Sequence, residues 1–127
     1  MITPQILNGG DITIGVPLRR VYVSDGQMVS TGFSLSQLSD VEVKVIGENQ
    51  NEIPVSFAGS AQSVDVTISA GSSTPGYYGL KIAGKLGGRN VRSYQDRYFK
   101  LVQTDEEVTA TANEQGIYVM TEPMIIR

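Results

Sequence analysis

The sequence predicts an all-β protein, and three observations support this fold class. Apolar residues alternate with polar ones in several short runs, which is the period of a strand with one buried face. Fourteen Gly and five Pro residues among 127 indicate many turns between short elements. No window of about eleven residues sustains the period of an amphipathic helix. We therefore expect a single antiparallel β-sandwich, immunoglobulin-like in architecture, with seven or eight strands and a C-terminal extension.

The expected strands can be read along the chain from this alternation. The second of them is the least regular, because Arg19 and Arg20 stand in its middle, and a bulge or an edge position would accommodate the pair. The later ones are rich in Val, Ile and aromatic residues, which favour a pleated surface. In chain order, strands are expected at residues 11–14, 16–23, 41–46, 53–57, 64–68, 78–82 and 90–102.

Turn signals separate these runs. Asp25-Gly26 is a tight-turn dipeptide, and residues 48–51 are typical of a polar hairpin loop. Residues 34–39 allow one turn of helix, and residues 84–90 contain three glycines between two strand patterns. A strand signal about every ten residues is typical of an antiparallel sandwich or barrel.

The chain changes character near its C-terminus, so we expect residues 1–104 to form the sandwich and residues 105–127 a separate segment. Two interpretations are open: this segment supplies the last strands, or it is an extension that docks on a neighbouring subunit. An apolar strand at a terminus is an aggregation hazard unless something covers it. In the second case the partner-binding residues would be Ile117, Tyr118, Val119, Met120, Met124, Ile125 and Ile126.

The composition excludes many kinds of chemistry. With no Cys and no His, the chain has no disulfide, thiol nucleophile, imidazole base, Ser-His-Asp triad or Cys- or His-ligated metal. Carboxylates such as Asp40, Glu42 and Asp65 stand singly and show no catalytic spacing. We therefore expect no enzyme, no cofactor and no metal. The absence of a long apolar run argues against a membrane span, and residues 1–10 do not resemble a secretory signal.

Charge is concentrated in one region. Residues 81–100 hold six bases and one acid, although the whole chain has a net charge of −3, which argues against nucleic acid as the main partner. Three interpretations are open: a solvated hairpin whose bases pair with nearby acids, a docking surface for an acidic protein, or a nucleic-acid surface. We expect Lys85 and Arg89 to lie together in a loop. The candidate basic residues are Lys85, Arg89, Arg92 and Arg97.

Four features of residues 10–107, about three quarters of the chain, belong together: the Gly10-Asp11 entry to a strand, the Leu-Ser turn and strand of residues 35–45, Pro75-Gly76-Tyr77-Tyr78, and the hairpin of residues 89–102. With these features the chain resembles a β-sandwich domain of tailed phages and prophages of Bacteroides-type gut bacteria. It is also similar to the N-terminal domain of the phage baseplate upper protein.

The resemblance implies a virion structural protein made in the host bacterial cytoplasm: an adaptor, a head-fibre base or a capsid-decorating subunit. Its partners would be capsid, portal or tail proteins, and we expect a homo-oligomer that binds neither nucleic acid nor membrane. The alternative is a carbohydrate-binding module for a host surface glycan. In that case exposed tyrosines would stack on sugar faces, and the candidates are Tyr77, Tyr94 and Tyr118.

Overall fold

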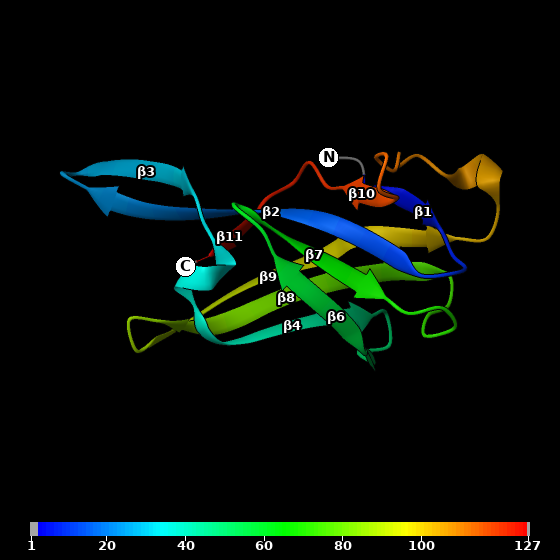
Figure 1. Cartoon of the computed structure of the whole chain (residues 1–127), viewed down its shortest axis with the longest axis horizontal. Coiled ribbons are helices and arrows are strands. Elements are labelled where there is room, and N and C mark those ends of the chain that lie inside the picture. The colour runs from blue at the N-terminus through cyan, green and yellow to red at the C-terminus, as the bar shows by residue number, and fades with distance from the viewer. Residues whose placement is uncertain (1–2, 127) are drawn as a thin grey trace.

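Two β-sheets pack face to face in the computed structural model, which describes residues 3–126 (Figure 1). The prediction of an all-β sandwich is confirmed at this level. Residues 3–126 form eleven strands, more than the seven or eight expected. Four of the eleven are only two or three residues long, too short to show a period in the sequence. The predicted turn of helix is a 3-10 turn, η1 (Leu35–Gln37), and a second, η2 (Asp105–Glu107), follows the last long strand.

The longest strands are two neighbours in the first sheet and a single strand in the second. The first sheet has the order β1-β9-β8-β4-β5, and the second has the order β10-β2-β7-β6 with β3 and β11 paired to the outer half of β2. The bounds are β1 (Gln5–Leu7), β2 (Ile12–Ser24), β3 (Gln27–Gly32), β4 (Ser39–Gly47), β5 (Glu52–Ile53), β6 (Val55–Gly59), β7 (Ser63–Ile68), β8 (Gly76–Leu86), β9 (Arg89–Val102), β10 (Ile117–Val119) and β11 (Met124–Ile126).

The strand pairing is mixed, so the prediction of a purely antiparallel sandwich is wrong. The hairpins pair antiparallel, but β1 runs parallel to β9, and both β10 and β11 run parallel to β2. All three exceptions are short segments from the two ends of the chain. They reach strands far away in sequence, and a parallel pair needs such a long connection.

The core lies between the two sheets and is made by alternate residues of the long strands. Val45, Leu80 and Phe99 from the first sheet are fully buried, as are Ile14 and Val66 from the second. Every buried side chain among residues 3–126 is hydrophobic. The alternation seen in the sequence is therefore the alternation between core and solvent.

Pro54 divides what the sequence presents as one strand at residues 53–57. The two residues before it belong to β5 in the first sheet, and the residues after it belong to β6 in the second. Proline has no N–H group to donate to a strand ladder, so the chain crosses between the sheets at this point.

Strand β2 is longer than the sandwich that contains it. Its first half pairs with β7 from Ile12 to Pro17, and its second half pairs with β3 from Arg19 to Ser24. The pairing through Arg19 and Arg20 runs in register, so the bulge suggested for this pair is absent. The β2–β3 hairpin consequently projects beyond the body of the molecule (Figure 1).

The C-terminal segment lies against its own domain. Strands β10 and β11 both pair with β2, and Met120, Met124 and Ile126 are at most 3% exposed. Of the two interpretations of this segment, the structure has the one in which it supplies the last strands. Within residues 3–126, no helix is long and apolar enough to cross a membrane.

Candidate functional site

The projecting β2–β3 hairpin, residues 19–32, carries several exposed apolar side chains, and we call it the arm. Its Asp25-Gly26 turn has backbone φ angles of 52° and 76°, as a two-residue turn between twisted strands requires. Six large hydrophobic side chains are exposed among the described residues, and three of them lie on the arm: Tyr22 (41%), Val23 (67%) and Met28 (75%). No arm residue is buried.

Both faces of the arm carry apolar side chains. Val23 pairs with Met28, so these two point to one face, and Tyr22 pairs with Val29 on the other. Residues 22–24 are exposed on both faces, so this part of the strand has no core face to keep apolar and no outer face to keep polar. For the same reason, no alternation in the sequence marks the arm as a candidate site.

Side-chain contacts brace the arm from within. Arg19 donates from Nε to Ser30 Oγ at 2.9 Å and from Nη2 to the Ser30 carbonyl at 3.0 Å. The guanidinium of Arg20 lies 5.5 Å from the centre of the Tyr22 ring, in the range of a cation–π contact. These contacts give the arm a defined shape.

The second sheet also has an open edge. Strand β6 pairs with β7 alone, so its outer backbone edge has no strand partner within the described part of the chain. Its Phe57 is 40% exposed. Beside β6 lies a hollow of about 480 Å³ with a mixed lining: Leu35, Val41, Gly59 and Ala61, with Ser34, Ser36 and Ser60. An open strand edge is a place where another strand can add.

The predicted partner-binding residues of the C-terminal segment do not form a free surface. Met120, Met124 and Ile126 are buried by pairing with β2, and in this position they cannot reach a partner. The prediction for these three is therefore corrected: they are core residues. Ile117, Tyr118 and Ile125 are half-buried, and only Val119, 63% exposed, is open to solvent.

The four candidate basic residues do not form one surface either. Lys85 pairs with Asn90, and Arg89 pairs with Leu86, so Lys85 and Arg89 point to opposite faces of the β8–β9 hairpin. The expectation that they lie together is wrong. Arg92 shares the outer face with Lys85, whereas Arg97 lies further along β9, beside Tyr77.

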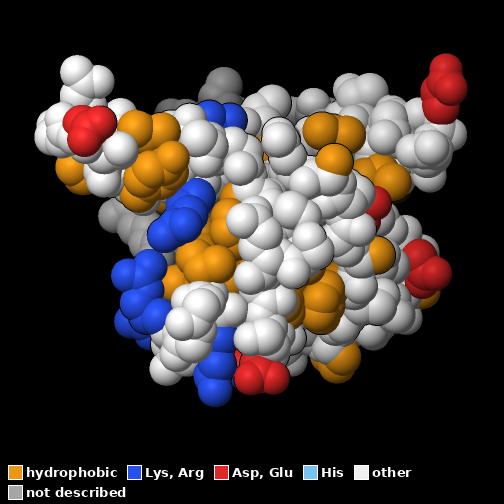
Figure 2. Space-filling model, turned by 60° about the vertical axis from the view of Figure 1, so that its left-hand side comes forward, with side chains coloured by type: hydrophobic (Ala, Val, Ile, Leu, Met, Phe, Trp, Pro, Cys, Tyr) orange, Lys and Arg blue, Asp and Glu red, His pale blue; other side chains and the backbone are white. Residues whose placement is uncertain are grey.

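Acids from β4 accompany the bases on the outer face of the first sheet. Lys85 Nζ lies 3.7 Å from Asp40, and both line a hollow of about 380 Å³ with Glu42, Lys81 and Arg92. Figure 2 brings forward the end of the molecule that includes the arm, and shows Lys and Arg side chains gathered on one side of it beside hydrophobic ones. Because acids lie among the bases, the outer face of the first sheet is closer to a solvated face than to a uniformly basic one.

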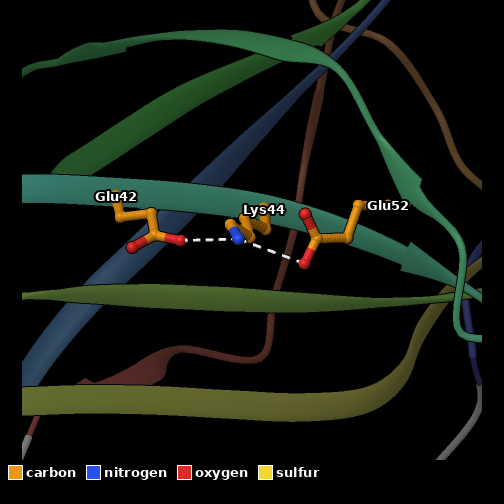
Figure 3. A network of polar contacts seen from close by, with 3 residues as sticks. All are labelled: Glu42, Lys44 and Glu52. Carbon is orange, nitrogen blue, oxygen red and sulfur yellow. Dashed lines mark hydrogen bonds and ion pairs between the residues drawn. The ribbon is translucent and has the colours of Figure 1, made fainter.

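The best-defined polar network lies on the same face (Figure 3). Lys44 Nζ lies 2.8 Å from Glu42 and 3.1 Å from Glu52, between the two carboxylates. The hydrogen bond and charge of Lys44 lower the pKa of Glu42, and the two carboxylates raise the pKa of Lys44. All three side chains are substantially exposed, so the network orders the surface without adding much stability.

Two of the three candidate tyrosines lie at one hollow. Tyr77 and Tyr94 line a space of about 230 Å³ on the outer face of the first sheet. Tyr118 is half-buried on β10, in the other sheet. Arg97, one of the candidate basic residues, also lines this hollow. The rest of the lining was not predicted: Glu48, Gln50 and Asp96, with Ile46, Gly47 and Gly79.

Within residues 3–126, no three acidic side chains gather in a way that would hold a metal ion. Two surfaces are candidates for binding: the arm with the open β6 edge, and the tyrosine-lined hollow. Comparison with protein-family models, curated proteins and solved structures found no match to this chain.

Proposed function

We propose that this chain is a structural assembly subunit that binds a second copy of itself through the arm. The exposure of Tyr22, Val23 and Met28 on a preformed hairpin is the observation that supports this most directly. Each such side chain contributes about 1.5–3 kcal/mol when it is fully buried. Association itself costs at least about 4 kcal/mol. The apolar contacts alone therefore support only weak, concentration-dependent binding.

Pairing between strand edges supplies the remaining affinity. Strand β3 is the outer strand of the arm, with six residues, and β6 is the open edge of the second sheet, with five. Adding β3 of one copy to β6 of the next would extend the sheet through main-chain hydrogen bonds. Phe57 on β6 and the apolar part of the hollow near Gly59 would contact apolar side chains of the arm, and this match favours a second copy as the partner.

The contact is heterologous, because the arm and the β6 edge are different surfaces of the same chain. Each bound copy keeps one free arm or one free edge, so copies join head to tail into a ring or a filament. The resemblance to phage sandwich domains supports the virion as the setting, with the chain acting as an adaptor, a head-fibre base or a capsid-decorating subunit. Capsid, portal or tail proteins would be its further neighbours.

We also propose the immunoglobulin-like class for the sandwich. Two packed sheets around one core, antiparallel hairpins and a chain crossing between the sheets at Pro54 support it. The arm and the three short parallel strands would then be additions to that plan.

Sedimentation velocity over a concentration series tests the assembly. The wild type should form concentration-dependent oligomers, and V23E/M28E should stay monomeric because it places two charges in the contact. V119E is the matched control, since it makes the same kind of change at an exposed valine away from the arm. It should assemble like the wild type.

Complementation tests the direction of the contact. V23E/M28E lacks the donor arm but keeps the β6 edge, whereas F57T weakens the edge and keeps the arm. A mixture of the two should form a heterodimer and stop there, while each alone stays monomeric. A wild type that is monomeric at about 1 mM, where even a binding energy of about −4 kcal/mol would be visible, would refute the proposal. So would a V119E variant as impaired as V23E/M28E.

A further inference from the structure

We infer that the hollow between Tyr77 and Tyr94 is a binding site for a neutral pyranose sugar. It lies on the outer face of the first sheet, where β8 and β9 pair beside the turn that follows β4. Its volume of about 230 Å³ is below the roughly 300–1,000 Å³ of pockets for drug-sized ligands, and it suits a single ring. This inference is independent of the arm, which belongs to the other sheet.

A buried glycine lines the hollow. Gly79 lies between outward-facing Tyr77 and Lys81 along β8, and the Tyr94 side chain lies where a side chain at Gly79 would be. A Cβ atom at Gly79 would lie 2.9 Å from Tyr94 Oη and 3.3 Å from Tyr94 Cε1. The Tyr94 ring therefore rests directly on the backbone of Gly79, and any other residue at this position would displace it.

Tyr94 is the surface on which a sugar would stack. Tyr94 is 50% exposed although its Oη and Cε1 atoms lie close to Gly79, so part of the ring is open to solvent. The Tyr94 hydroxyl donates to Asp96 Oδ1 at 3.4 Å, which orients the ring. An aromatic face held in one position with polar groups at its rim is the usual arrangement for binding a ligand that is apolar on one side and polar at its edge.

Arg97 is held at the hollow by an unusual backbone conformation. The register of β8 and β9 shifts between Tyr78 and Leu80, and Arg97 has a φ of +49°, which a side-chain-bearing residue seldom adopts. Its backbone N–H donates to Asp96 Oδ1 at 3.0 Å. The guanidinium lies 4.7 Å from the Tyr77 ring centre, and Lys100 Nζ lies 5.0 Å from the same ring. Tyr77 is thus the support for these cations.

The polar groups around the hollow are of both kinds. Glu48 and Asp96 accept hydrogen bonds, whereas the Arg97 guanidinium donates and, within residues 3–126, forms no ion pair with a carboxylate. Sugar hydroxyls donate and accept, so one ring can satisfy both sets. An acidic sugar would meet the two carboxylates and a cationic ligand would meet Arg97 and Lys100. A neutral sugar avoids both repulsions.

Amide chemical shifts in a ¹⁵N-labelled protein provide the test. The probes are glucose, galactose, mannose and N-acetylglucosamine as neutral sugars, with glucuronic acid and N-acetylneuraminic acid as acidic ones, each titrated into the millimolar range. At least one neutral sugar should shift the amides of Gly79, Tyr94 and Arg97 saturably. Y94A should weaken that binding at least about tenfold, a loss well outside the error of such a titration.

Two further variants keep the test specific. Y22A removes a comparably exposed tyrosine from the arm and should bind the sugar like the wild type. R97G removes the guanidinium while glycine accepts the positive φ without strain, so the variant should fold and bind more weakly. Absence of shifts with every neutral sugar would overturn the inference. Binding of acidic sugars only, or equal losses in Y94A and Y22A, would do the same.

Discussion

The hydroxyl of Tyr98 donates a hydrogen bond of 2.6 Å to the carbonyl oxygen of Glu122. This contact joins β9 in the first sheet to the segment just before β11, which pairs with β2 in the second. The Tyr98 side chain is only 4% exposed. Burial, and to a lesser extent the charge of Glu122, raises the pKa of the Tyr98 hydroxyl well above that of an ordinary tyrosine.

Replacing Tyr98 with phenylalanine should have opposite consequences at neutral and alkaline pH. At neutral pH, Y98F loses one buried hydrogen bond and about 1 kcal/mol of unfolding free energy. Above about pH 10 the unfolded wild type releases the Tyr98 proton while the folded form keeps it, so folded wild type loses stability by up to about 1.4 kcal/mol per pH unit. Y98F lacks this loss. Urea denaturation across this range should show the gap closing, and a constant gap would contradict it.

Truncating Met124 should show that the C-terminal segment is part of the core. Met124 is fully buried on β11, and removing its side chain in M124A should cost about 2–5 kcal/mol. V119A, on the exposed side of β10, is the control and should change the unfolding free energy by no more than about 0.5 kcal/mol. Urea denaturation measures both. Equal, small effects would mean that the segment does not pack as described.

Thr13 and Thr67 face each other across β2 and β7, with their hydroxyl oxygens 2.9 Å apart. T13V or T67V alone should each cost about 1 kcal/mol, because a half-buried hydroxyl loses its partner. The double variant should lose less than the sum, since valine fits a strand and leaves no polar group unpaired. A double-mutant cycle by thermal or urea denaturation gives the coupling energy. Additive losses would show that the two hydroxyls do not interact.

Lys44 should influence the titration of its neighbour more than the stability of the fold. In K44M the pKa of Glu42 should rise toward its ordinary value, because the hydrogen bond and the positive charge that lower it are gone. The melting temperature should barely change, since the network is exposed (Figure 3). NMR titration of the Glu42 carboxyl reads the pKa directly. K85M, whose lysine pairs with Asp40 instead, should leave the Glu42 value in place.

Much of the sandwich could be predicted from local alternation. Val43 and Val45 in β4, and Val64 and Val66 in β7, lie on the core face as their spacing indicates. The short parallel strands could not be predicted, because β1, β10 and β11 are three residues long and depend on distant partners. In the C-terminal segment, the apolar residues indicate burial, but their pattern does not show against which strand they pack.

The recognition surfaces were harder to predict for a different reason. The arm has no core face, so Val23 and Met28 follow no period that would mark them as a pair. The tyrosine-lined hollow depends on a register shift that brings Arg97 beside Tyr77, and on the small size of Gly79. Neither feature can be seen in the order of residues. The sequence marks Tyr77, Tyr94 and Arg97 singly, but it does not show that they lie together or that Glu48, Asp96 and Gly79 surround them.

The continuity of β2 has a mechanical consequence. One unbroken strand runs from the arm into the sandwich, where it is bonded to β7 and β10, with β11 alongside its middle. A force on the arm along the strand direction would load all of these ladders simultaneously. It would not open their hydrogen bonds one after another. A tether attached there would transmit tension along β2 to the strands that pair with it in the body of the sandwich.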